Sequence, residues 1–166
     1  MNYLIFDNDV YYDLEGKTGR APKSDIQAVF KGSTLETAVA VIDSLQKQVA
    51  APEKSLSRKD EVVSAAFTGE YLTQSERISE NLFQVVAVEK PRINEVYKSL
   101  GFENVRLLVP YAVALREYLK NNKLPDEKKK VVFLDHLGDQ VLLTIFNKDV
   151  FTAPRRLSKV LKQVTR

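Results

Sequence analysis

The chain contains no cysteine and only one histidine. Without cysteine there is no disulfide, no catalytic thiol and no Cys-based zinc or iron–sulfur site. One histidine also leaves no room for a metal site built from several imidazoles. Carboxylates and other oxygen groups are therefore the candidate metal ligands that the sequence offers.

Long apolar runs are also missing. The longest stretch without a charged residue, Leu107 to Leu115, has nine residues and contains Pro110. A membrane-spanning helix needs about 20 apolar residues, so we expect no span within this sequence. The first residues do not combine a basic region with an apolar run, so we expect no secretory signal there. No Gly-x-x-x-x-Gly-Lys motif occurs, which excludes a P-loop.

The 166 residues are 44% hydrophobic and 28% charged, a composition that favours one folded domain over a disordered chain. The net charge of +3 is uneven, because residues 155–166 carry five basic side chains and no acid. This end is interpreted either as a solvated helix face or as a juxtamembrane segment, since Lys and Arg flank membrane spans on the cytoplasmic side. Nucleic-acid binding is disfavoured, because the basic residues do not cover a whole face. They are Arg155, Arg156, Lys159, Lys162 and Arg166.

Predicted strands and helices alternate along most of the chain. Residues 3–6, 10–14 and 26–30 predict strands, with a loop at 15–23. Residues 33–36 match a capping box, and the apolar spacing that follows predicts a helix as far as residue 49. We predict further strands at 62–68, 82–88, 105–109, 131–134 and 140–146, a loop or short helix at 71–80, and helices that start at Pro91, Pro110 and Pro154.

This order of elements predicts an α/β fold with a mixed sheet. We expect residues 1–166 to form a single domain, with a small subdomain around 61–109 and a basic end at 155–166.

Two Asp-containing turns are the candidate sites, at residues 7–9 and 135–139. Such turns bind phosphate when small residues let the backbone amides approach. Here the carboxylate of Asp9 would repel phosphate, and in the second turn Asp139 follows Gly138. The carboxylates could hold magnesium, but turn geometry by itself also favours Asp and Asn. We therefore favour a structural role for both turns.

The single histidine, His136, is expected within the second turn. No serine or cysteine is arranged with it as a nucleophile, so the sequence does not indicate a catalytic triad. We expect a solvated or hydrogen-bonded turn residue.

Three segments resemble parts of actin-like proteins. Residues 3–9 resemble the first phosphate hairpin, Pro91–Leu119 resemble the family's helix, Leu-Gly-Phe turn, strand and Ala-rich helix, and residues 131–156 resemble the second phosphate hairpin with its following strand. The sequence most resembles the actin-like cytoplasmic domains of type IV pilus and type II secretion inner-membrane platform proteins, namely PilM, GspL and the bundle-forming pilus protein BfpC. BfpC-like proteins fit best, because their cytoplasmic region is a short N-terminal actin-like piece before a membrane span. The resemblance implies a truncated actin-like (RNase H-like) fold, a mixed sheet with flanking helices.

The sequence departs from the ATP-binding members of this family. Those members keep an Asp-x-Gly pattern in each hairpin, whereas here Asp9 stands at the glycine position of the first and Gly138 is displaced by one in the second. The second half of the fold is also largely missing. The resemblance therefore implies no nucleotide cofactor and no enzymatic activity.

The resemblance implies instead a scaffold on the cytoplasmic side of the bacterial inner membrane. Its partners would be the pilus assembly ATPase and other platform proteins, with no nucleic acid. Its membrane attachment would come from a span outside this sequence, and a homodimer is a further option.

Two alternatives stay open. A nucleotide-binding actin-like protein, similar to PilM or FtsA, would use Asp7, Asp135 and Gly138 around a magnesium-bound phosphate. An RNase H-like nuclease would need a carboxylate cluster that holds two metals, for which Asp7, Asp9 and Asp135 are the candidates.

Overall fold

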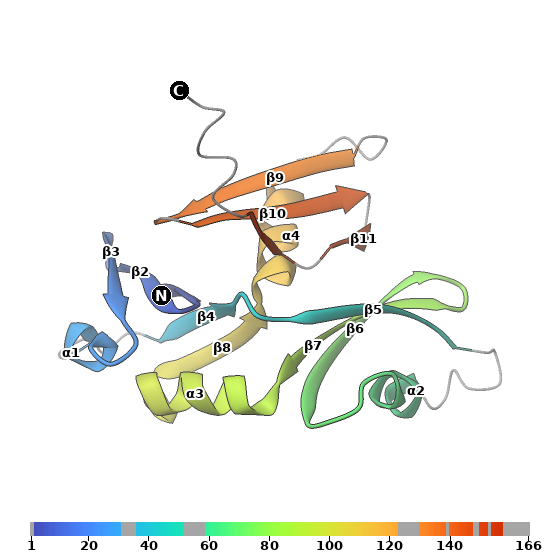
Figure 1. The fold of residues 1–166 in the computed structure, drawn as a ribbon, viewed down its shortest axis with the longest axis horizontal. Helices are drawn as coiled ribbons and strands as arrows, with labels where there is room; N and C mark the ends of the chain where they lie inside the picture. The colour runs from blue at the N-terminus through green and yellow to red at the C-terminus, as the bar shows by residue number, and fades with distance from the viewer. Residues whose placement is uncertain are drawn as a thin grey trace. The chain divides into compact units, whose positions relative to one another are not determined.

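The computed structural model describes residues 2–30, 36–51, 59–122, 130–138, 140–147, 150–152 and 154–157. The chain divides into two compact units, Met1–Tyr111 and Ala112–Arg166, which are described separately (Figure 1). Among these described residues, no helix is both long and apolar enough to cross a membrane.

The first unit is built on a five-stranded mixed sheet with the strand order β3-β2-β1-β4-β8. Strands β1, β2 and β3 pair antiparallel, whereas β1, β4 and β8 run parallel. The carboxyl ends of the three parallel strands therefore meet at one edge of the sheet, where open α/β sheets commonly bind ligands. The strands of this sheet are β1 (Asn2–Phe6), β2 (Asp9–Leu14), β3 (Lys17–Pro22), β4 (Thr37–Val41) and β8 (Val105–Pro110).

One face of this sheet is packed against helices. In β1, Leu4 and Phe6 are buried while Tyr3, just before Leu4, is exposed, as the two-residue period of a strand requires. Helices α1 (Ile26–Phe30) and α3 (Lys90–Leu100) contribute to the core on the buried face. The core consists of Leu4, Phe6, Val10, Leu14, Ala21, Ile26, Phe30, Val39, Val41, Val88, Ile93, Val96 and Leu100.

A second, smaller sheet lies within the same unit and has the order β5-β7-β6, with both pairings antiparallel. Its strands are β5 (Leu45–Ala50), β6 (Tyr71–Ser79) and β7 (Leu82–Glu89), and helix α2 (Lys59–Ala65) belongs to it. It has its own core of Ala51, Val63, Phe67, Phe83, Val85 and Ala87. That the whole chain acts as one domain with a subdomain around 61–109 stays a prediction.

The second unit contains most of helix α4 (Tyr111–Asn121) and a four-stranded antiparallel sheet. Strand β10 (Gln140–Asn147) pairs with β9 (Lys130–Leu137) on one side, and with β11 (Val150–Phe151) and β12 (Arg155–Leu157) on the other. Leu142, Thr144 and Phe146 of β10 are almost fully buried.

Several predicted elements are confirmed. Helix α3 has Pro91 in its first turn, and it ends at Gly101, whose positive φ of 83° suits a residue without Cβ and whose amide donates to the Tyr97 carbonyl oxygen at 2.9 Å. Helix α4 and strands β7, β8, β9 and β10 also lie where the sequence predicts them.

The predicted helix that follows the capping box is wrong, because β4 and β5 occupy its described part. Strand β4 lies between β1 and β8, and alternate side chains at Thr37, Val39 and Val41 are fully buried. Pairing on both sides of β4 therefore outweighs the weak helical spacing. Residues 33–35, with the serine of the capping box, lie outside the described residues.

Five other expectations were wrong for the same kind of reason. The predicted strands at 26–30 and 62–68 are helices α1 and α2, in which residues spaced by four, such as Ile26 and Phe30, share a buried face. The predicted loops at 15–23 and 71–80 contain the polar edge strands β3 and β6. The helix predicted from Pro154 is replaced by strand β12, and its later residues lie outside the described residues.

Candidate functional site

The first candidate turn, at residues 7–9, joins β1 to β2 at the carboxyl edge of the parallel strands. The side chain of Asp7 is buried, with the residue 1% exposed, and its backbone N–H donates to the Asp9 carbonyl oxygen at 3.0 Å. The carboxylate of Asp9 accepts from Arg20 Nε on β3 at 2.7 Å and lies 2.5 Å from Arg20 Nη2. Asp9 stands where the ATP-binding actin-like proteins, which this sequence resembles, keep glycine. In this chain that position therefore carries an ion pair.

The second candidate turn is shorter than the sequence predicts. Asp135 and His136 lie inside strand β9, where they pair with Leu142 and Val141 of β10, so the prediction that they form the turn is wrong. Gly138 follows β9 with a φ of 57°, a left-handed conformation that favours glycine. The strand extends to Leu137 because its residues pair with β10 throughout.

The candidate residues fall in different units of the chain. Asp7 belongs to the first unit, and Asp135 and Gly138 belong to the second. Within the described parts of the chain, no group of three or more His, Cys, Asp or Glu residues could hold a metal ion. Of the predicted basic end, Arg155 and Arg156 lie in β12, and Lys159, Lys162 and Arg166 lie outside the described residues.

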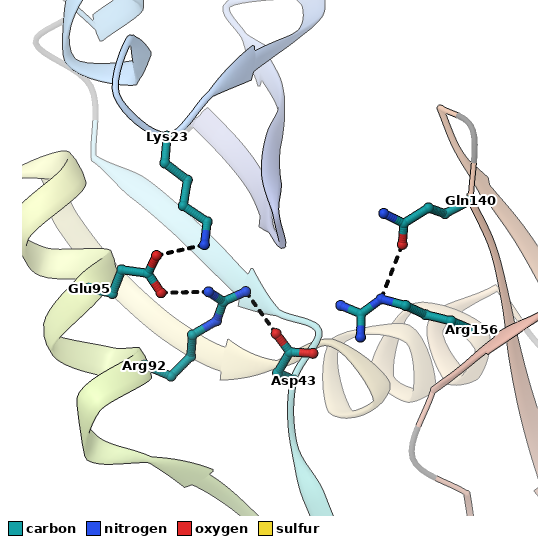
Figure 2. Close-up of polar contacts among 6 residues, drawn as sticks. All are labelled: Lys23, Asp43, Arg92, Glu95, Gln140 and Arg156. Atoms are coloured by element: carbon teal, nitrogen blue, oxygen red, sulfur yellow. Dashed lines mark hydrogen bonds and ion pairs between the residues drawn. The ribbon is translucent and has the colours of Figure 1, made fainter.

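Sequence reasoning missed a cluster of charged residues near the carboxyl ends of β1 and β4 (Figure 2). Glu95 Oε1 lies 2.6 Å from Lys23 Nζ, and Glu95 Oε2 lies 2.5 Å from Arg92 Nη1. Arg92 Nη2 lies 2.8 Å from Asp43 Oδ2. Arg92 and Glu95 are three residues apart on α3, but Lys23 and Asp43 come from distant parts of the sequence, so only tertiary packing brings the four charges together.

The cluster lies over the aromatic ring of Phe6 at the end of β1. The guanidinium carbon of Arg92 lies 5.0 Å from the ring centroid, and Lys23 Nζ lies 5.2 Å from it. Both distances are within the range of a cation–π interaction. The end of β1 is thus covered by two cations that Glu95 and Asp43 balance.

The cluster also changes the acidity of Glu95. Burial raises the pKa of this carboxyl, but hydrogen bonds and charge from Lys23 and Arg92 outweigh burial and hold the pKa below its ordinary value. Glu95 is therefore an ionised partner for the two cations and not a proton donor near neutral pH.

A pocket of about 360 Å³ opens beside Arg92, where the chain passes from β4 into β5 and from β7 into α3. Arg92 Nε and Ser44 Oγ are buried, and neither has a hydrogen-bond partner among the described residues. A buried polar atom without a partner is costly, so a bound group that accepts from Arg92 would be favoured. The lining residues are Asp43, Ser44, Leu45, Ala87, Glu89 and Arg92.

No protein-family model and no curated protein matches the sequence. Solved structures do match its fold. The cytoplasmic domain of EpsL, an inner-membrane component of the type II secretion system of Vibrio cholerae, is similar over 95% of this chain and 70% of its own, with 12% identity and a TM-score of 0.59. The PilM–PilN type IV pilus biogenesis complex is similar over 98% of this chain and 62% of its own, with 12% identity and a TM-score of 0.63.

A Bacteroides thetaiotaomicron protein, described as having an actin-like ATPase fold and unknown function, is similar over 95% of this chain with 6% identity and a TM-score of 0.49. The chain spans less than two thirds of the PilM–PilN chain that it matches. The fold implied by the sequence resemblance is confirmed: the chain has a truncated actin-like α/β fold, with a mixed sheet and flanking helices.

Proposed function

We propose that this chain is a non-catalytic scaffold of the inner-membrane platform of a type IV pilus or type II secretion machine. It lies on the cytoplasmic side of the membrane and recruits the assembly ATPase and other platform proteins. The similarity to EpsL and PilM–PilN over nearly the whole chain supports a platform role. The Asp9–Arg20 ion pair carries the non-catalytic part of the proposal.

The geometry of the first turn argues against a phosphate site. A phosphate at this turn would meet the carboxylate of Asp9 at the position where glycine would expose backbone amides. Moving Arg20 toward the phosphate would break its ion pair and leave Asp9 uncompensated. In the second turn, Asp135 is a strand residue and only Gly138 is described at the turn itself.

Calorimetric titration of the chain with ATP and magnesium tests this reading. We expect no heat of binding. Micromolar binding would contradict the scaffold proposal and favour the nucleotide-binding alternative, with Asp7, Asp135 and Gly138 around the phosphate. In that case, Asp7→Asn should abolish the binding.

Partner recruitment needs a surface, and the pocket beside Arg92 is our candidate. Arg92 Nε and the Ser44 hydroxyl offer donors to backbone carbonyl groups, and the exposed side chain of Leu45 offers an apolar contact. Asp43 and Glu89 accept from backbone amides or attract basic side chains. This mixture suits an extended segment of another platform protein.

Pull-down of platform proteins with the chain and its variants tests the pocket. Leu45→Asp and Glu89→Lys should each weaken capture of the partner that uses this surface. Leu72→Asp is a matched control, because Leu72 is exposed on the opposite edge strand of the same small sheet. Capture of no pilus or secretion component by the unmodified chain would contradict the proposed function.

A further inference from the structure

The outward face of the sheet in the second unit is apolar at its centre, with one basic residue at an end of β9 and another on the edge strand β12. Val132 and Leu134 of β9 have exposed fractions of 57% and 52%. The strand register places Val132 beside Ile145, and it places Leu134 beside Leu143 and then Arg155 of β12. Directly paired residues share a face, so these side chains form rows across neighbouring strands.

Two further rows complete this face. Lys130 pairs with Asn147 at one end, and His136 pairs with Val141 and then Leu157 toward the other. We call the whole set the outer face of the second unit. The described residues of the outer face are Lys130, Val132, Leu134, His136, Val141, Leu143, Ile145, Asn147, Val150, Arg155 and Leu157.

The opposite face of the same sheet is already packed. Leu142, Phe146 and Phe151 are almost fully buried there, and the guanidinium carbon of Arg116 on α4 lies 5.5 Å from the Phe151 ring centroid. Figure 1 shows α4 on one side of the pair of β9 and β10. Within the described residues of the second unit, Val132 and Leu134 of the outer face stay exposed, so this side of the sheet can meet another surface.

The charges on the outer face decide which kind of surface fits. Its described residues include Lys130 and Arg155, both exposed, and no carboxylate. Asp135 of β9 pairs with Leu142 and so projects on the packed face. A second copy placed face to face would bring Lys130 and Arg155 near like charges, which disfavours self-association through this face.

We propose that the outer face lies against the anionic phospholipid surface of a membrane. Phosphate headgroups complement Lys130 and Arg155, and the rows of Val132 and Leu134 enter the interfacial region between them. The proposal rests on the proposed place of the chain at the inner membrane. It adds an orientation, in which the sheet of the second unit faces the lipid and the packed side with α4 faces away.

Cosedimentation with vesicles tests this contact. The 166-residue chain should bind vesicles that contain phosphatidylglycerol, bind pure phosphatidylcholine vesicles poorly, and be released by high salt. Replacing both Lys130 and Arg155 with Gln should lower the partition coefficient by roughly 25-fold, since each basic residue contributes about a factor of five. Leu134→Ser should lower it by roughly threefold through lost apolar contact.

Matched control variants distinguish binding through the outer face from a general effect of charge or exposed apolar side chains on vesicle binding. Arg106→Gln and Leu107→Ser alter exposed residues on β8 of the first unit, where Arg106 is 66% exposed and Leu107 is 50% exposed. Both controls should leave vesicle binding unchanged. Circular dichroism of each variant establishes that it has folded.

Three results would overturn the proposal. They are failure to bind phosphatidylglycerol vesicles, equal loss of binding in the β8 controls, and a concentration-dependent dimer in sedimentation velocity that Leu134→Ser abolishes. The last result would assign the outer face to a second copy of the chain. Partner pull-down contains no lipid, so its failure would count against the platform function and not against the lipid contact.

Discussion

The carboxylate of Asp9 on β2 accepts a hydrogen bond from Arg20 Nε on the neighbouring strand β3, at 2.7 Å. The side chains are 26% and 47% exposed, so water screens their attraction. The pair therefore adds little to stability, although it fixes the chemistry of the first turn. Under the scaffold proposal, it places a carboxylate where a phosphate would approach the first turn.

We predict that Arg20→Ala lowers the free energy of unfolding by only about 0.2–1 kcal/mol, because an exposed ion pair contributes no more than this. Urea unfolding measures the difference. Arg106→Ala is the control, since Arg106 Nε lies 3.6 Å from Glu36 Oε2 and both side chains are more than half exposed. A loss at Arg20 of several kcal/mol would contradict the prediction and indicate a structural role for the pair.

Phe6→Ala should destabilise the chain by about 3–5 kcal/mol, because Phe6 is fully buried and its removal leaves a cavity. The ring also supports Arg92 and Lys23, so the variant should loosen the charged cluster. Tyr3→Ala on the same strand should change stability by no more than about 0.5 kcal/mol, because Tyr3 is 59% exposed. Thermal and urea unfolding of the two variants make the comparison. Similar losses in both would mean that the burial pattern of β1 is wrong.

The hairpin between β2 and β3 holds a residue in an unfavourable conformation. Glu15 has a φ of 53° and Gly16 a φ of 81°, as a two-residue hairpin turn requires. Glu15→Asn should raise the free energy of unfolding by up to about 1 kcal/mol, because Asn tolerates the left-handed region better. Thr18→Asn, within β3 of the same hairpin, should give no such gain. Chemical unfolding measures the free energy of unfolding of both variants. A lower value for Glu15→Asn than for the unmodified chain would contradict the left-handed conformation of Glu15.

Acid should weaken the charged cluster. The pKa of Glu95 is lower in the folded chain than its ordinary value of 4.5, so the unfolded chain binds this proton more readily. The stabilisation from Glu95 is therefore complete above its unfolded pKa, and it is lost as the pH falls through the lower, folded value. We expect Glu95→Gln to flatten the fall in stability below about pH 4.5, where carboxylates begin to protonate.

Urea unfolding at a series of pH values measures this effect. Glu80→Gln is the control, because Glu80 is an exposed residue at the turn between β6 and β7. If the free energy of unfolding depends on pH in the same way in the Glu95→Gln and unmodified chains, the charged cluster does not cause the loss of stability in acid.

The sequence by itself determined the elements whose local signals agree with their surroundings. Pro91 and Gly101 mark the two ends of α3, and the fully apolar run of residues 131–134 lies within a strand. The resemblance of residues 3–9, Pro91–Leu119 and 131–156 to actin-like proteins was enough to predict the fold that the solved structures share. These segments are short-range patterns, which a sequence displays directly.

Tertiary structure decided the elements whose local signals are weak or mixed. The apolar spacing of residues 35–49 predicted a helix, but the described part of this segment forms strands. Strand β4 pairs with β1 on one side and with β8 on the other, and this pairing outweighs the helical spacing. The polar segments at 17–22 and 71–79 are strands because each pairs with a more buried neighbour.

The charged cluster also depended on tertiary structure. Lys23 and Asp43 stand far in the sequence from Arg92 and Glu95, which are three residues apart on α3, and no short-range pattern links the two groups. Folding brings α3 beside the end of β4, and only then do their charges interact. Composition excluded thiol and multi-histidine chemistry at the outset, but which charges meet, and which face of a sheet stays open, is determined by long-range packing.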